Sequence, residues 1–219
     1  MRFAKMPAGE FVMGSPAGEA GRQVDEVMHA VRLGKGFCMG VTEVTQRQWE
    51  AVVGGGNPSK VKGPELPVTG VTWADAVRFC AMLSEKEGRK YRLPTEAEWE
   101  RACRAGEDGP FSGGGADEVA WHLGNSGEVA HPVGGLRPNG GGLHDMHGNA
   151  MEWCADWYQE RLGREMAADP AGPPIGESRV ARGGSFRHNA RAARSAARHA
   201  VTPSYQYEHL GFRVLMECE

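Results

Sequence analysis

Long apolar runs are missing from this sequence. No stretch approaches the roughly 20 apolar residues that a membrane-spanning helix needs. Met1 to Ala20 hold charges and glycines where a secretion signal would need an apolar run. We therefore expect a cytoplasmic protein without a membrane segment.

Closely spaced cysteines are missing as well. The five cysteines form no CxxC pair, and neither their odd number nor their spacing indicates a disulfide framework or a zinc site. They are Cys38, Cys80, Cys103, Cys154 and Cys218. We expect them to be reduced and mostly buried.

A large excess of one charge is absent too. Charged residues make up 24% of the sequence and the formal net charge is -3, so no general attraction to nucleic acid or to an anionic membrane is expected. One stretch differs, because seven arginines and a single acid, Glu208, lie between Arg179 and Arg213. Nucleic-acid binding is one interpretation of that stretch, but it is not the one we favour.

Internal ion pairs are the favoured interpretation for three of these arginines, Arg194, Arg198 and Arg213. A planar guanidinium can bind a carboxylate and several loop carbonyls at once. The candidate partners are Glu152, Asp156 and Glu98. Arg187 and Arg191 then remain free for a ligand.

Glycine is what the sequence has in abundance. Its 32 glycines, with 13 prolines, predict many turns and much irregular backbone. The glycines follow no Gly-X-Y period and 40% of the residues are hydrophobic, which excludes collagen and disorder. No linker divides the 219 residues, so we expect one domain.

Threonines mark the starts of three expected helices. Thr45 with Gln48 and Thr95 with Glu98 have capping-box spacing, and Thr72 caps the helix between them. Glycines at 54–56, 88 and 106 are the expected ends. Trp73, Val77, Cys80 and Leu83 are expected on the apolar face of the middle helix.

Strands are expected on both sides of these helices. Residues 1–15 predict a hairpin-like opening around Pro7 to Gly9, and a second strand region follows over 31–44. Residues 107–142 read as coil with a short strand near 129–133. Short strands of an antiparallel core are expected over 151–158, 179–186 and 210–215.

Seven ordered phrases carry a resemblance to a known family. They are MPAGEFVMGS, VTEVTQRQWE, PVTGVTWADAVRFC, YRLPTEAEWERACRAG, HPVGGLRPNGGGLHDMHGNAMEW, RVARGGSF and HLGFRV. Together they resemble the formylglycine-generating enzyme, or sulfatase-modifying factor, family from about Met6 to Leu215. The resemblance implies an α+β fold of the C-type-lectin type over residues 1–219, with two main helices, small twisted antiparallel sheets and extensive ordered loops.

The enzyme of that family holds copper with two cysteines just after a GGS motif. Here Gly183-Gly184-Ser185 is followed by Phe186 to Ala193 without a cysteine. Copper(I) prefers thiolates, and His188 does not replace a pair of them. We therefore expect neither copper nor formylglycine generation.

The resemblance also implies a structural calcium site in the phrase GLHDMHGNAMEW. Its ligands would be the Asp145 side chain, the Gly148 and Ala150 carbonyl oxygens and the Glu152 carboxylate. Hard oxygen ligands suit calcium. The alternative is that Asp145 and Glu152 cap turns or pair with arginines.

Residues 186–209 resemble the variable region of diversity-generating-retroelement target proteins, which place an adaptable surface on this fold. The segment is rich in side chains that bind partners by hydrogen bonds and aromatic contact. The expected ligand-binding residues are Phe186, Arg187, His188, Asn189, Arg191, His199, Thr202, Tyr205, Tyr207, Glu208 and His209. The leading hypothesis is a non-catalytic recognition domain for a protein or a small ligand.

Two other hypotheses stay open. One is a metal-dependent oxidase or other enzyme in the same pocket, with His188 as the metal-binding or proton-transferring residue. The histidines do not favour it, because His188, His199 and His209 are scattered in the sequence and Ser185 has no readable His-Asp arrangement. The other is a purely structural calcium-stapled module.

Overall fold

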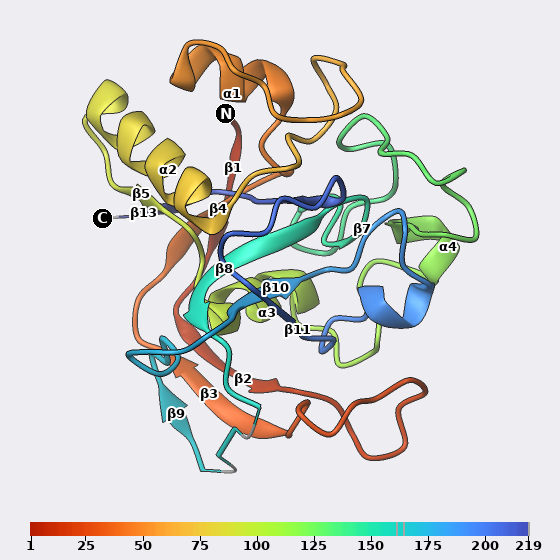
Figure 1. Cartoon of the computed structure of the whole chain (residues 1–219). Coiled ribbons are helices and arrows are strands. Elements are labelled where there is room, and N and C mark those ends of the chain that lie inside the picture. Colours follow the sequence, from red (N-terminus) through yellow and green to blue (C-terminus); the bar gives the residue numbers. More distant parts are fainter. Residues whose placement is uncertain (161, 164, 219) are drawn as a thin grey trace.

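The computed structural model describes residues 1–160, 162–163 and 165–218, and it has an α+β fold built from small sheets and long ordered loops (Figure 1). The α-helices of the described residues are α1 (Gln46–Val53), α2 (Trp73–Glu87), α3 (Glu96–Arg104) and α4 (Ala116–Val119). A short 3-10 helix, η1, spans Ala190–Ala193. No helix among the described residues is long and apolar enough to cross a membrane.

Local side-chain chemistry starts the three longer helices as predicted. Thr45, Thr72 and Thr95 each accept a hydrogen bond from the backbone N–H three residues on, and the residue there closes a capping box. Gly54 and Gly88 end α1 and α2 in the left-handed conformation. The third helix differs from the prediction, because its C-cap is Ala105, in that conformation with a φ of 48°, and Gly106 follows it with a φ of 91°.

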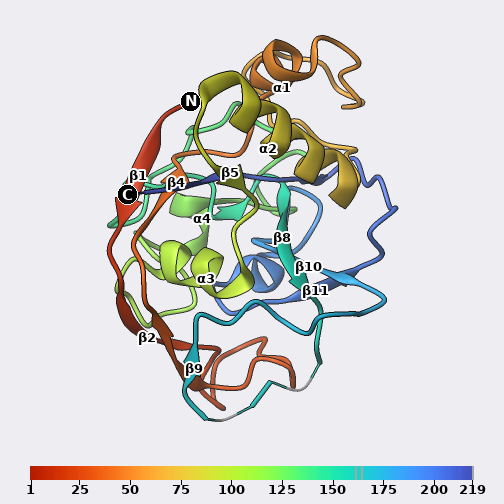
Figure 2. The ribbon, with the colours of Figure 1, turned by 90° about the vertical axis from the view of Figure 1, so that its left-hand side faces the viewer.

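Two sheets have four strands each. The first has the order β1 (Phe3–Met6), β4 (Phe37–Gly40), β13 (Leu215–Glu217) and β5 (Tyr91–Arg92). The second has the order β11 (His199–Val201), β10 (Arg179–Arg182), β8 (Met151–Trp157) and β12 (Leu210–Gly211). The strands nearest the two chain ends, β1 and β13, therefore both pair with β4. Figures 1 and 2 show the two termini on the same side of the molecule.

Two smaller sheets complete the fold. One has the order β2 (Gly9–Met13), β3 (His29–Leu33) and β9 (Ala167–Ala168), and the other pairs β6 (Ala120–Trp121) with β7 (His147–Gly148). Their positions correct several sequence predictions. β1 and β2 pair with β4 and β3 and form no hairpin with each other. The predicted strand near 129–133 is absent from these described residues, and β12 runs parallel to β8, not antiparallel.

The central sheet has a hydrophobic cluster on each face. Trp153 of β8 and Ala181 of β10 pack in the cluster that holds α1 and α2, whereas their neighbours Cys154 and Val180 pack in the cluster that holds α3. This alternation is what a strand with two buried faces requires. The predicted face of α2 needs one correction, because Val77 is 38% exposed and Ala76 and Phe79 are buried instead.

A set of buried ion pairs ties the loops to this centre. We call it the arginine–carboxylate interior, and it comprises Arg182, Arg194, Arg198 and Arg213 with Glu26, Glu96, Glu100 and Glu152. Arg213 binds Glu152 through two nitrogens at 2.6 and 2.7 Å. The prediction of internal pairing is confirmed for all three arginines, but only Glu152 is a correctly predicted partner. Glu98 binds Arg92 instead, and Asp156 accepts the backbone N–H of Glu96.

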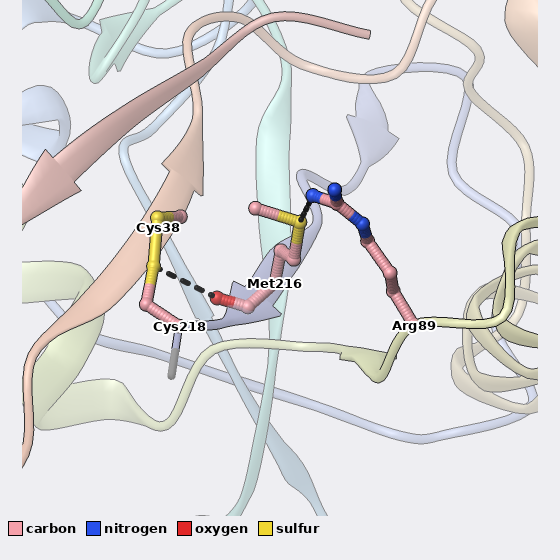
Figure 3. The surroundings of a disulfide bond; sticks show 4 residues. All are labelled: Cys38, Arg89, Met216 and Cys218. Atoms are coloured by element: carbon pink, nitrogen blue, oxygen red, sulfur yellow. Dashed lines mark hydrogen bonds between the residues drawn. A yellow bond between two sulfur atoms is a disulfide. The ribbon is translucent and has the colours of Figure 1, made fainter.

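The structure corrects the expectation that every cysteine is reduced. Cys38 of β4 and Cys218, just beyond β13, form a disulfide across 180 residues (Figure 3). Cys80, Cys103 and Cys154 are free and buried, as predicted. Sequence spacing could not reveal the pair, because β13 reaches β4 only through the tertiary fold.

Candidate functional site

The loop after β10 is shaped by two glycines. Gly183 and Gly184 have φ of 87° and 64°, a conformation that favours glycine. A Cβ at Gly184 would lie 2.8 Å from the Ala192 oxygen, closer than side chains tolerate. This tight turn brings the start of the loop against η1.

Three histidines that are scattered in the sequence meet at this turn. The ring of His188 lies 5.5 Å from that of His199 on β11 and 5.1 Å from that of His209 just before β12, measured between centroids. The strand order β11-β10-β8-β12 produces this meeting, because the loops at the ends of these strands lie close together. The tertiary structure thus makes a cluster that the spacing did not indicate.

Aromatic rings extend the histidine cluster toward solvent. Tyr207 stacks on His209 with centroids 5.2 Å apart and an interplanar angle of 10°, and Tyr205 meets Tyr207 edge to face at 5.3 Å. Phe186 is buried and meets the ring of His209 edge to face, with centroids 6.3 Å apart. Tyr205 and Tyr207 are 49% and 39% exposed, so their rings are available to a partner.

Charged side chains lie at the rim of this cluster. Arg187 binds Glu208 at 2.6 Å, and Lys60 binds the same carboxylate at 3.1 Å. These bonds lower the pKa of Glu208, the one from Lys60 most strongly. The expectation that Arg187 is free is therefore wrong, although its side chain is 43% exposed. Lys60 was missed, because it precedes the segment by more than a hundred residues.

We name this set the C-terminal loop surface. It comprises Phe186, Arg187, His188, His199, Tyr205, Tyr207, Glu208 and His209. Three further predicted residues lie on the same segment, and among the described residues their side chains form no hydrogen bond, ion pair or ring contact with this set. The Asn189 oxygen accepts the Ala192 N–H and Arg191 packs against Gly21. The backbone oxygen of Thr202 accepts the Tyr205 N–H, so Thr202 contacts the set through its backbone alone.

The histidines of the C-terminal loop surface are uncharged at neutral pH. Burial, together with the neighbouring rings of His199 and His209, lowers the pKa of His188 to about 4. Burial also lowers the pKa of His199 and that of His209. Neutral imidazoles can both donate and accept hydrogen bonds, and the buried Nδ1 of His209 has no partner among the described residues.

A catalytic arrangement of Ser185 and His188 is present only in part. His188 Nδ1 lies 2.8 Å from the Ser185 hydroxyl, a contact that the sequence analysis did not anticipate. Ser185 is fully buried, so its hydroxyl is closed to a substrate. We interpret this bond as one that holds the His188 ring in place.

The turn predicted to bind calcium gives a divided result. Asp145 has a buried Oδ1 without a hydrogen-bond partner, while its Oδ2 accepts the Gly134 N–H at 2.6 Å. Both oxygens of Glu152 are occupied by Arg213, and Oε2 also accepts the Trp99 indole N–H at 2.6 Å. Asp145 fits a cation and Glu152, in this arrangement, does not.

A third buried acid at this turn was not predicted. Glu43 accepts the Ala150 N–H at 3.0 Å, and burial with the nearby Asp145 and Glu152 raises its pKa well above the usual range. Burial likewise raises the pKa of Asp145. Within the described ranges, no group of three or more His, Cys, Asp or Glu side chains is placed to hold a metal ion.

Burial favours the protonated form of the three free thiols. Burial raises the pKa of Cys80 and of Cys103 to about 12, and that of Cys154 also lies well above the usual range. Thiolates are the reactive and metal-binding form of cysteine. None of these three thiols belongs to the C-terminal loop surface.

Comparison with known proteins agrees with this fold and defines the class of protein. The sulfatase-modifying factor enzyme 1-like domain matches residues 3–218, so the chain belongs to this family. The bovine (Bos taurus) formylglycine-generating enzyme is 37% identical over 169 residues. That match covers 68% of this chain and 44% of the bovine protein, so the chain spans less than half of that relative's length.

Two solved structures resemble the chain over nearly its whole length. Treponema denticola variable protein 1 superposes with a TM-score of 0.90 at 30% identity, covering 99% of this chain and 95% of that protein. PvdO from Pseudomonas aeruginosa gives a TM-score of 0.88 at 31% identity, covering 99% and 94%. These matches confirm the predicted family and fold class.

Proposed function

We propose that this chain is a non-catalytic recognition domain that presents the C-terminal loop surface to a protein partner. The observation that carries the proposal is the convergence of His188, His199 and His209 with exposed tyrosines on a scaffold fixed by buried ion pairs. A rigid support reduces the entropy lost on binding, and exposed aromatic and arginine side chains are those that dominate protein interfaces.

The similarity to Treponema denticola variable protein 1 supports the same proposal. That protein is named for variability, it shares the fold over nearly the whole chain, and residues 186–209 have the composition of an adaptable surface. A coding near-copy of residues 186–209, beside a reverse transcriptase gene, would support membership of the diversity-generating systems. Its absence would leave a recognition domain of fixed sequence.

Site-specific photo-crosslinking tests the proposal directly. A crosslinking amino acid at Tyr207 is expected to give one discrete protein adduct in the native cells. The matched control places the same amino acid at Ile175, which is 81% exposed and lies outside the C-terminal loop surface. Identical adduct patterns from both positions would contradict the proposal.

An assay of chemistry tests the rival hypothesis. The purified chain is expected to carry no stoichiometric copper or iron and to consume no oxygen with thiol peptides. Oxygen-dependent oxidation that is lost in His188→Gln would establish an enzyme and overturn the recognition proposal. No observation in the described residues favours that outcome.

Calcium at the Asp145 turn remains a prediction. Titration calorimetry with calcium chloride, on wild type and Asp145→Asn, tests it. One bound calcium in the wild type and none in the variant would confirm the prediction. An absence of binding in the wild type would contradict the calcium prediction and leave Glu152 as the ion-pair partner of Arg213.

The cytoplasmic location also remains a prediction. Disulfides persist mainly in oxidising compartments, so the Cys38–Cys218 bond is the feature that opposes it. Thiol labelling of the chain in its native cells decides the matter. Labelling of both cysteines before reduction would favour the cytoplasm.

A further inference from the structure

A separate cavity lies where α3, β8 and the segment before β10 meet. It has a volume of about 240 Å³ and shares no lining residue with the C-terminal loop surface. Its polar wall includes His29, Glu96, Asp156 and Arg198. Its other wall is apolar and includes Met13, Ala167, Pro170 and Pro173.

Asp156 is the buried acid of this cavity for which the described residues provide no cationic partner. Its side chain is buried, and Oδ2 accepts the backbone N–H of Glu96 at 2.9 Å. Among the described residues it forms no salt bridge, and its Oδ1 receives no hydrogen bond from another side chain. A carboxylate buried without a cation is unfavourable unless something compensates for its charge.

The cations near Asp156 that the structure describes contact other groups. Arg198 gives two bonds to Glu96, at 2.6 and 2.8 Å, and others to the Asp25 and Gln159 carbonyls. Arg179 is held between the rings of Trp73 and Trp157, 3.7 and 3.5 Å from their centroids. Glu96 is thereby neutralised, whereas Asp156 is not.

We propose that this cavity binds the ammonium group of a small aliphatic amine. Asp156 is the carboxylate partner of the ammonium, and the apolar wall contacts the hydrocarbon part. The bond from the Glu96 N–H occupies one oxygen of Asp156 and anchors the start of α3, which leaves the second oxygen for the ligand. The proposal does not depend on the recognition function.

The protonation of Asp156 gives the proposal a distinctive pH dependence. Burial, followed by the charge of Glu96, raises the pKa of Asp156 to about 7. Glu98 also faces it from α3, Arg179 from β10, and His29, Glu165 and Arg198 line the same cavity. Because the ammonium binds the ionised carboxylate, affinity rises with pH and levels off above the pKa.

Titration calorimetry with n-butylamine tests this. Binding is expected to be about tenfold weaker at pH 6 than at pH 8, since a carboxyl of pKa near 7 is about nine-tenths protonated at pH 6. The isosteric alcohol n-butanol is expected to bind at least about tenfold more weakly than the amine, because it lacks the charge. Equal affinities for the two probes, or no binding of the amine, would overturn the proposal.

Two variants separate the site from general folding. Asp156→Asn keeps an oxygen for the Glu96 N–H and is expected to lose at least about tenfold in affinity and the pH dependence. Ala171→Trp places a bulky ring at an exposed lining position and leaves Asp156 itself unchanged, and it is also expected to abolish binding. Glu165→Gln, at an exposed lining position, is the matched control and should bind within about twofold of wild type. Wild-type affinity in both Asp156→Asn and Ala171→Trp would refute the site.

The ammonium group can come from a free amine or from a lysine side chain. Nα-acetyl-lysine methylamide is the second probe. Binding of both probes places the cavity within reach of a partner's lysine, and binding of butylamine alone identifies a free amine as the ligand. Either result supports an amine site.

Discussion

Two regions of this molecule are built from the same kinds of residue and behave differently. The arginine–carboxylate interior and the C-terminal loop surface both pair arginines with glutamates, and residues 179–213 supply the arginines of both. Arg213 and Glu152 are fully buried, whereas the side chains of Arg187 and Glu208 are 43% and 27% exposed. The difference teaches that solvent, and not residue type, separates a structural ion pair from one that is available to a partner.

The interior pairs fix the loops because each arginine binds several groups at once. Arg213 binds Glu152, the Gly40 carbonyl and the His144 carbonyl. A buried charge that loses its partner is strongly unfavourable. On the C-terminal loop surface, water replaces a lost partner at little free-energy cost. Under the proposed function, Arg187 could therefore exchange Glu208 for a group on the partner protein.

The largest effect is expected from breaking an interior pair. Arg213→Met leaves Glu152 buried beside Glu43 and Asp145 without a cation, and we expect a loss of about 3–5 kcal/mol in the free energy of unfolding. Urea denaturation followed by tryptophan fluorescence measures it. A loss below about 1 kcal/mol would remove the distinction between the two regions.

The disulfide is expected to have the next largest effect. It closes a loop of 180 residues in sequence, and cross-links over long loops stabilise by restricting the unfolded chain. Cys218→Ser is expected to lower the free energy of unfolding by about 2–4 kcal/mol. Wild type in reductant serves as the control, because it should match the variant. A variant as stable as the oxidised wild type would contradict this.

Low pH is expected to destabilise the fold through two histidines, one in the interior and one on the C-terminal loop surface. Burial lowers the pKa of His147, in the interior, and that of His188, on the C-terminal loop surface, each to about 4. Because the unfolded chain binds these protons near pH 6.5, stability is full above that pH and falls as pH drops toward 4. His188→Gln should remove on the order of 1 kcal/mol of this loss, less than a fully buried group would.

Nuclear magnetic resonance titration of the histidine ring protons checks this assignment. Both rings are expected to remain neutral down to about pH 5, and His188→Gln should leave the His147 titration unchanged. A pKa near 6.5 for His188 would show that its ring is open to water. Its place in the C-terminal loop surface would then need revision.

The smallest effect is expected from the rim of the C-terminal loop surface. Glu208→Ala removes the partner of Arg187 and Lys60, and the free energy of unfolding should change by less than about 1 kcal/mol. The same denaturation experiment measures it beside Arg213→Met. Crosslinking from position 207 should change in this variant although the free energy of unfolding does not. A large loss of stability would show that Glu208 supports the fold and is not available for exchange with a partner.

Local chemistry is what sequence reasoning predicted well. The capping boxes of Thr45, Thr72 and Thr95 join residues three positions apart, so their geometry follows from the sequence alone. The pairing of Arg213 with Glu152 was also anticipated. Long-range partners were missed, because Glu26 and Glu96 lie 168 and 102 residues from the arginines that they bind.

The sequence by itself determined the family, the helix starts and the absence of cysteines after the GGS motif. Only the tertiary structure decided which distant residues meet: Cys38 with Cys218, His188 with His199 and His209, and Asp156 with the apolar wall of its cavity. The physical reason is that capping and turn preferences act over a few residues. Pairing between distant charges, thiols and rings depends instead on how the sheets and loops pack.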